Sequence, residues 1–128
     1  MNDNKEISVL YFNTRDELIR VDLRKVGFFK ADRNYTDVYF LNNHRVTLPT
    51  NLMSIEKMLD DDRMRGRTIP FVRIGRSVIV NLSHLIHINV PKQEVVLSYM
   101  TSPCILKVEL NKEALRKLKD LYIANKNK

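Results

Sequence analysis

The chain has 128 residues, of which 44% are apolar, and its 22 Lys and Arg against 15 Asp and Glu give a formal charge of +7. This length suits one domain with one modest core, and with only 3 Gly and 4 Pro the composition excludes a disordered or fibrous chain. A basic domain of this size points towards a polyanion, most often nucleic acid, with an anionic membrane surface as the weaker option. Because no apolar run approaches 18 residues and residues 1–6 hold no hydrophobic signal core, we expect a soluble, cytoplasmic protein without a membrane partner.

The single cysteine, Cys104, excludes an internal disulfide and agrees with a reducing compartment. It alternates with Leu106 and Val108, so we expect it to pack as a small apolar residue of a strand.

Short segments of alternating apolar and polar residues, separated by turn residues, predict strands along most of the chain. The turns are expected around Asn13–Asp16, around Ala31–Asn34, at Asn42-Asn43 and around Pro91–Gln93. The strands are then expected over residues 7–12, 17–22, 26–30, 35–41, 44–48, 85–90, 94–98 and 105–110.

A further strand segment covers residues 71–82. Phe71 to Ile74 alternates apolar with charged residues, whereas Val78 to Val80 is a β-branched run suited to a strand covered on both sides. Gly75-Arg76-Ser77 lies between them, and we expect the strand to bend or change sheet there.

Two helices are expected. In the first, Leu52, Ile55 and Leu59 share one face after Asn51, a natural N-cap. Three acids at a helix C-terminus oppose its dipole, so we expect fraying at residues 60–62.

Asn111 caps the second expected helix, from Lys112 to about Ile123, with residues 124–128 as a frayed polar tail. No linker and no internal repeat is apparent, so the fold class is mainly antiparallel β in a single domain over residues 1–128.

No arrangement in the sequence predicts catalysis, a cofactor or a metal. His84 and His87 are three residues apart at the entry of a hairpin, where that spacing places them on opposite faces of a strand. The glycines form no phosphate-binding loop, and the acids at 60–62 have no other ligand beside them.

Residues able to contact nucleic acid lie in the turns. Arg33-Asn34-Tyr35 places a forked donor, an amide and an aromatic hydroxyl in succession, and Arg and Asn can bind guanine and adenine through two hydrogen bonds each. The alternative is that Asn34 only forms the turn. Arg73, Arg76, Lys112 and Arg116 suit phosphates better than bases, or else are solvated surface charges.

The segment from Phe71 to Asn81 resembles the signature of the LytTR family, roughly Phe-x-Arg-x-His-Arg-Ser-x-x-Val-Asn, with Gly75 in place of His. Val26 to Tyr35 resembles the family's hydrophobic strand followed by Glu-Ala-x-Gly-Asn-Tyr, with Lys30 for the acid and Arg33 for the glycine. Asn51 to Leu59 resembles its Ser-Leu-x-x-Leu-Glu-x-x-Leu helix. The likeness covers about residues 7–122.

The resemblance implies small antiparallel sheets stacked in an elongated β-β-β sandwich that binds DNA with loops. It implies DNA contacts from the loop at Arg33 to Tyr35, from Asn51 beside its capping role, and from Lys92 and Gln93 at the tip stiffened by Pro91. Which residue of that tip touches DNA stays open.

The function we expect is therefore sequence-specific binding to duplex DNA by a transcriptional regulator, on tandem half-sites, with a homodimer on DNA and a separate signalling protein as possible partners. The rival is a protein-interaction module of the same fold that pairs with another regulator and does not read DNA. The chain leaves no room for a receiver domain, so we expect a stand-alone regulator or an excised domain, and Met1 favours the former.

Overall fold

The computed structural model describes residues 8–64, 70–98 and 105–126, with only the backbone for 62–64, 105–107 and 125–126. The strands in these ranges are β1 (Val9–Asn13), β2 (Leu18–Asp22), β3 (Val26–Asp32), β4 (Tyr35–Phe40), β5 (Arg45–Leu48), β6 (Phe71–Ile74), β7 (Val78–Asn81), β8 (Leu85–Asn89), β9 (Glu94–Ser98) and β10 (Ile105–Glu109). The helices are α2 (Leu52–Met64) and α3 (Lys112–Lys126), with short 3₁₀ turns η1 (Leu23–Lys25) and η2 (Leu82–His84). None of these helices is long and apolar enough to cross a membrane.

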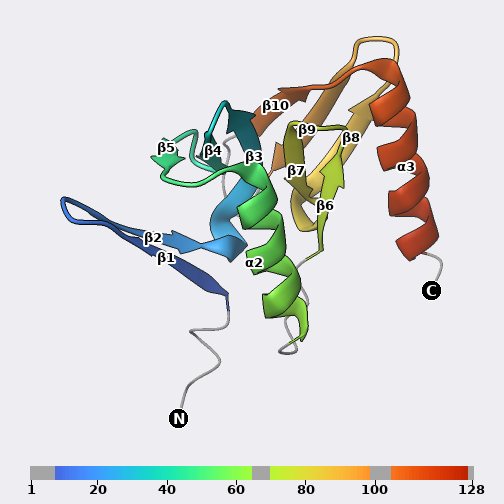
Figure 1. The fold of residues 1–128 in the computed structure, drawn as a ribbon. Coiled ribbons are helices and arrows are strands. Elements are labelled where there is room, and N and C mark those ends of the chain that lie inside the picture. Colours follow the sequence, from blue (N-terminus) through green and yellow to red (C-terminus); the bar gives the residue numbers. More distant parts are fainter. Residues whose placement is uncertain (1–7, 65–69, 99–104, 127–128) are drawn as a thin grey trace.

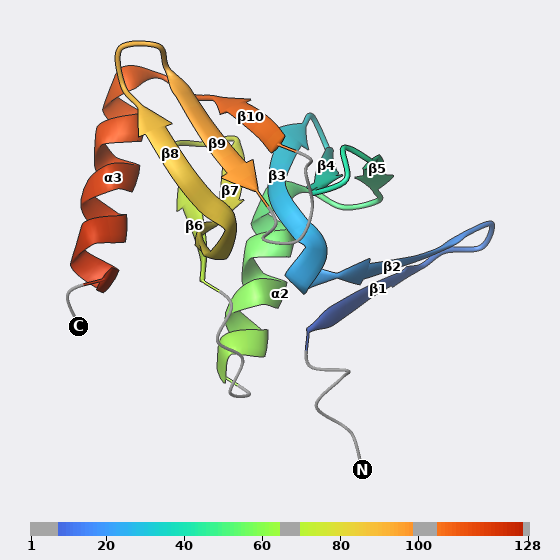
Figure 2. The same ribbon diagram turned by 180° about the vertical axis from the view of Figure 1, so that it is seen from behind.

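The strands form three antiparallel sheets. β1 pairs with β2, a five-stranded sheet has the order β5-β4-β3-β7-β6, and a three-stranded sheet has the order β10-β9-β8. Figures 1 and 2 show the five-stranded sheet in the middle, with the β1–β2 hairpin projecting away from the body. The expectation of a mainly β fold with two helices is confirmed.

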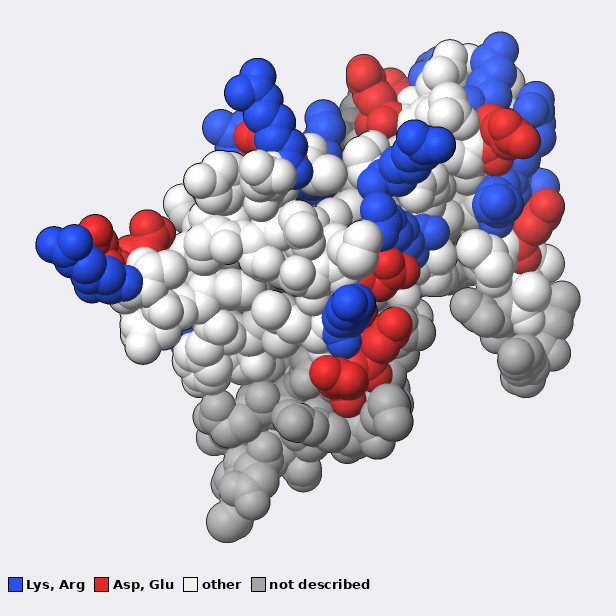
Figure 3. All heavy atoms as spheres, viewed as in Figure 1, with Lys and Arg blue, Asp and Glu red and all other residues white. Residues whose placement is uncertain are grey.

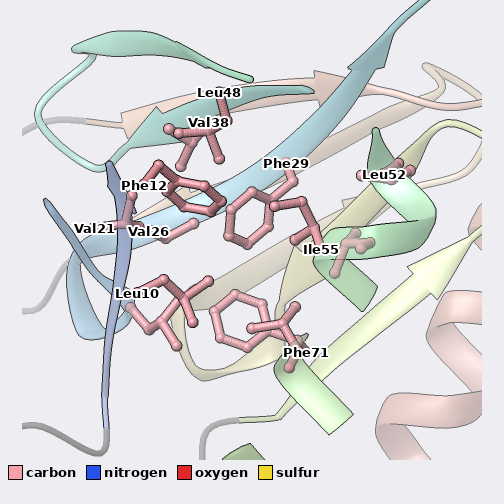
Figure 4. Packing of buried hydrophobic residues seen from close by; sticks show 13 residues of the cluster. Leu10, Phe12, Val21, Val26, Phe29, Val38, Leu48, Leu52, Ile55 and Phe71 are labelled. Atoms are coloured by element: carbon pink, nitrogen blue, oxygen red, sulfur yellow. The ribbon is translucent and has the colours of Figure 1, made fainter. Parts of the chain in front are cut away.

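The two faces of the central sheet bury two separate apolar clusters, because side chains alternate along each strand. Phe29 and Ile79 belong to the cluster on the face covered by α2 and the β1–β2 hairpin. Figure 4 shows Phe29 among its neighbours in that cluster. Phe28 and Val80 point to the opposite face, which packs against the three-stranded sheet and α3. All four residues of β7 are buried, as their β-branched run predicts.

The segment at residues 71–82 corrects the expectation of one bent strand. β6 and β7 pair antiparallel from Phe71↔Asn81 to Ile74↔Val78, so the chain reverses between them. The reversal is possible because Gly75 adopts a φ of 66°, a left-handed conformation that costs glycine little. The glycine therefore closes a hairpin, and both strands remain in the same sheet.

Both helices are longer than expected. α2 continues through the three acids to Met64, and α3 continues past Ile123 to Lys126. Leu52, Ile55 and Leu59 are each at most 3% exposed, and burying such side chains stabilises α2 by more than surface charges near the dipole destabilise it. The last strand, β10, begins at Ile105, and Cys104 lies outside the described residues.

The order of elements repeats, which the sequence analysis did not find. A hairpin, a 3₁₀ turn, three strands and a helix occur first as β1 to α2 and again as β6 to α3. Each 3₁₀ turn is capped by an Asx side chain: Asp22 Oδ1 accepts from the Arg24 N–H at 3.1 Å, and Asn81 Oδ1 accepts from the Ser83 N–H at 2.9 Å. A register shift follows at the start of both β3 and β8.

The backbone hydrogen bonds of the two units agree as well. The N–H of Leu23 donates to the Ser8 carbonyl at 2.8 Å, and the N–H of Leu82 donates to the Pro70 carbonyl at 2.9 Å. In both units the residue after the Asx cap is thus tied to the residue just before the first hairpin. The domain is built from two copies of one ββ-η-βββ-α unit.

Candidate nucleic-acid interface

The β3–β4 hairpin ends in a two-residue turn. Asp32 pairs with Tyr35, so Arg33 and Asn34 form the turn, and all of these residues are exposed. Arg33 has a φ of 59°, so the left-handed position belongs to Arg33 and Asn34 is not needed for it. The alternative that Asn34 only makes the turn is weakened, since its amide projects from a conformation that other residues adopt equally well.

The β6–β7 turn lies directly beside this tip. The Ala31 N–H donates to the Ser77 carbonyl at 2.8 Å, and Lys30 of β3 is in register with Val78 of β7. Arg76 is exposed at the middle of the turn. The pairing of β3 with β7 therefore places the turn that contains Arg76 next to the turn that contains Arg33.

Arg73 has a structural role that the sequence analysis did not predict. One guanidinium nitrogen donates to Glu56 Oε1 of α2 at 2.9 Å, and another donates to the carbonyl oxygen of Arg76 at 2.7 Å. The Arg73 side chain is 28% exposed and that of Glu56 is 39% exposed. Arg73 thus braces the β6–β7 turn against α2, and its contact with phosphate stays a prediction.

The β8–β9 tip is also held in one conformation. Gln93 has a φ of 54°, and its N–H donates to the Val90 carbonyl at 3.0 Å. The N–H of Lys92 donates to Asn89 Oδ1 at 3.0 Å. These bonds use only the backbone N–H groups of Lys92 and Gln93, and both residues are exposed.

The start of α3 adjoins this tip. Lys92, Gln93 and Asn111 together line a shallow hollow of about 380 Å³. Asn111 Oδ1 accepts from the Ala114 N–H at 2.8 Å, so its predicted capping role is confirmed. Lys112 and Arg116 are exposed on the first turns of the same helix.

Asn51 caps α2 as predicted, since its Oδ1 accepts from the Ser54 N–H at 2.9 Å. The Thr36 hydroxyl donates to the Thr50 carbonyl at 2.9 Å, which ties the start of α2 to the start of β4. Asn51 is exposed, and its side-chain NH₂ group remains available as a donor.

Figures 1 and 2 show that the β3–β4, β6–β7 and β8–β9 tips and the start of α3 all lie on one side of the molecule, with the start of α2 set back from them. We call these three tips and the α3 start the tip edge. Lys and Arg side chains gather along this side in Figure 3. The tip edge is basic at both ends and acidic between them, because Glu94 and Glu109 are paired across β9 and β10 and line a hollow of about 340 Å³ with Lys30.

Among the described residues, no three His, Cys, Asp or Glu side chains gather in the way that holds a metal ion. His84 lies in η2, not in a strand, and its Nε2 is 2.9 Å from the Arg24 carbonyl oxygen. His87 lies on β8 and is exposed.

The model of the LytTr DNA-binding domain matches residues 16–122. The chain belongs to the LytTR family of DNA-binding domains. A solved structure from Bacillus cereus, described as the LytTr DNA-binding domain of a methyl-accepting/DNA response regulator, is similar with 25% sequence identity and a TM-score of 0.60. The likeness covers 89% of this chain and 95% of that one, and no curated protein matches the sequence.

LytTR domains bind DNA as the output domains of transcriptional regulators and are not enzymes. The geometry explains one departure of this LytTR domain from the family pattern. Arg33 stands where the pattern has glycine, at a φ of 59° that glycine adopts without strain. This domain therefore carries a cation, at some cost in backbone strain, at a hairpin tip that forms part of the tip edge.

Proposed function

We propose that this LytTR domain binds duplex DNA sequence-specifically, with its hairpin tips entering successive major grooves. The observation that carries the proposal is the tip edge: three hairpin tips and one helix start lie on one side of the molecule, and their exposed residues have hydrogen-bonding side chains. Such an edge suits a double helix, which presents its grooves along a line.

Base reading is assigned to the tips that have multiple hydrogen-bonding groups. Arg33 suits guanine, Asn34 suits adenine, and Gln93 suits adenine at the other end of the tip edge, with Tyr35 beside the first pair. Each good pair of this kind discriminates against a wrong base by about 1–3 kcal/mol.

Phosphate contacts are assigned to the cations around those tips. Arg76, Lys92, Lys112 and Arg116 are exposed, and such contacts fix the register of a protein on DNA without reading sequence. The NH₂ group of Asn51, set back from the tip edge, suits a phosphate close to the first tip.

Rigidity supports the proposal as much as charge does. The tips at Arg33, Gly75 and Gln93 have fixed left-handed residues, and Arg73 braces the middle one. A loop that is ordered before binding loses less conformational entropy on docking. Residues held in sparsely populated backbone conformations also concentrate at functional sites.

One domain makes only a few base contacts through three tips, which discriminates weakly against a genome of competing sites. We therefore propose cooperative binding of two copies to tandem half-sites spaced by a multiple of about 10.5 bp, with DNA bending as tips enter neighbouring grooves. The test is a gel-shift series in which one half of a site selected from random duplexes is moved in single base-pair steps. Affinity that ignores spacing through a full turn would contradict cooperative pairing.

The assignment of base reading is tested separately with Asn34→Ala. We expect a loss of about 1–3 kcal/mol on the selected site and a much smaller loss on random DNA. Arg76→Ala should weaken binding to the selected site and to random DNA about equally. Arg15→Ala, at the exposed β1–β2 tip, is the matched cation control and should change neither affinity. Equal losses for Asn34→Ala on both DNAs would show that this tip does not read bases, and no binding at all would favour a protein-interaction module.

A further inference from the structure

A hollow of about 410 Å³ lies away from the tip edge, between β2, η1 and the β4–β5 turn. Its wall is mostly apolar and comes from Ile19, Phe40, Leu41 and Val46. Leu41 is buried, whereas the other three are half-buried because one side of each faces the hollow. Large apolar side chains left partly open in this way favour an apolar occupant.

The walls are fixed by hydrogen bonds. The N–H of Leu41 donates to the Lys25 carbonyl at 2.9 Å, which joins the end of β4 to η1. In the β4–β5 turn the N–H of His44 donates to Asn42 Oδ1 at 2.9 Å, and Asn43 has a φ of 71°. The hollow is therefore formed before anything binds.

The rim is cationic. Arg20 and Lys25 supply its positive charge, His44 lies beside them, and no Asp or Glu of the described residues lines it. The nearest carboxylate along the chain, that of Asp22, accepts hydrogen bonds from two guanidinium nitrogens of Arg24 at 3.0 and 3.1 Å. Asp22 also attracts the charge of Lys25, so Arg20 is the main cation left to attract a ligand anion and Lys25 contributes less.

We propose that this hollow binds a small amphipathic organic anion, with an aromatic or aliphatic body against Phe40 and Val46 and a carboxylate between Arg20 and Lys25. A volume of about 410 Å³ is in the range of small-molecule sites and is too small for a folded partner. β4 begins at Tyr35, beside the β3–β4 tip, and ends at Phe40, which lines the hollow. The hollow and the tip edge are therefore about 17 Å apart along this strand. The proposal does not depend on which bases the tips read.

The probe is 2-naphthoate, with its neutral isostere 2-naphthamide as the control ligand. Both are titrated into the ¹⁵N-labelled full chain and followed by heteronuclear NMR. We expect saturable naphthoate shifts concentrated at the amides of Lys25, Leu41, Asn42 and His44, and binding of the amide weaker by about fivefold or more, as for loss of one near-surface charge pair. Shifts at Arg33 or Gln93 instead, equal binding of both probes, or no saturable shifts would overturn the proposal.

The matched variants are Arg20→Gln/Lys25→Gln and, as control, Arg15→Gln. All three side chains are exposed, so each variant is expected to fold, and a thermal melt verifies this. Naphthoate affinity should fall about tenfold in the double variant and stay unchanged in the control. Unchanged affinity in the folded double variant would refute the cationic recognition.

Discussion

Replacing Arg33 with glycine should stabilise the domain while weakening its binding to DNA. Arg33 has a φ of 59°, and a left-handed conformation costs an L-residue about 1–2 kcal/mol. Glycine avoids that cost but loses about 0.5–1 kcal/mol more chain entropy on folding. The net expectation is a gain of about 0.5–1 kcal/mol in the free energy of unfolding, or about 2–5 °C in Tm for a chain of this size.

The same variant removes a forked donor from the tip, so affinity for a selected site should fall about tenfold or more. Stability is measured by urea and thermal denaturation, and affinity by fluorescence anisotropy at fixed salt. Asn43→Gly is the matched control, because Asn43 has a φ of 71° but lies in the β4–β5 turn, away from the tip edge. Asparagine tolerates this conformation well, so the entropy lost with glycine should cancel or outweigh the strain relieved, and the control should not gain stability and should keep its DNA affinity. An Arg33→Gly domain that is less stable, or that binds as before, would refute the reasoning.

Three further changes test the charges. Glu56→Gln should weaken the brace on the β6–β7 turn, with roughly 0.5 kcal/mol lost from stability and an affinity loss on random and selected DNA alike, measured by urea denaturation and anisotropy. Glu109→Gln removes an acid from the tip edge and should raise DNA affinity at low salt, an advantage that should vanish as salt is raised; a salt-independent gain would contradict a charge effect. Burial tends to raise the pKa of Asp22, but hydrogen bonds from Arg24 and the nearby charges outweigh it and lower that pKa below 3.8. Its stabilisation is then present above pH 4 and is lost as the pH falls through the lowered pKa, so Asp22→Asn should be less stable by up to about 1 kcal/mol at pH 7. The difference from the parent in urea melts should narrow as the pH falls below 4, and a difference that stays constant over that range would contradict this.

Local patterns in the sequence were enough to predict the β1–β2, β3–β4 and β8–β9 hairpins and the apolar faces of both helices. The period of two in β3 and β4, and the spacing of Leu52, Ile55 and Leu59, depend on neighbours along the chain. The caps at Asn51 and Asn111 were predictable for the same reason, since a cap bonds to a backbone group three residues away.

Features that depend on distant residues were not predictable in this way. From the sequence alone, Gly75 indicates a bend in one strand, and only the pairing of β6 with β7 shows that the chain reverses there. The role of Arg73 requires Glu56 of α2, 17 positions earlier, to lie against it. The repeat was not apparent in the sequence because the two units share a backbone pattern more than residues. A short match such as Val-Asp-Leu in one unit and Val-Asn-Leu in the other is too brief to indicate a repeat.

The sequence predicted individual residues of the candidate site, but it did not predict that they lie together on one surface. Arg33, Asn34, Lys92 and Gln93 were chosen as turn residues, but their common side of the molecule follows from the order of strands in three sheets. The negative middle of the tip edge also comes from pairing, since Glu94 and Glu109 are opposite each other only in the register of β9 and β10.

The most direct test of DNA binding by the tip edge is the salt dependence of DNA affinity. A fluorescein-labelled duplex is titrated with the domain at several salt concentrations, and the logarithm of affinity is plotted against the logarithm of salt. If the tip edge contacts about five phosphates, the slope should be about −4 to −5, at about −0.9 per phosphate, and Arg76→Ala should reduce its magnitude by about one. A slope close to zero, or no binding at low salt, would contradict the claim that this edge binds DNA.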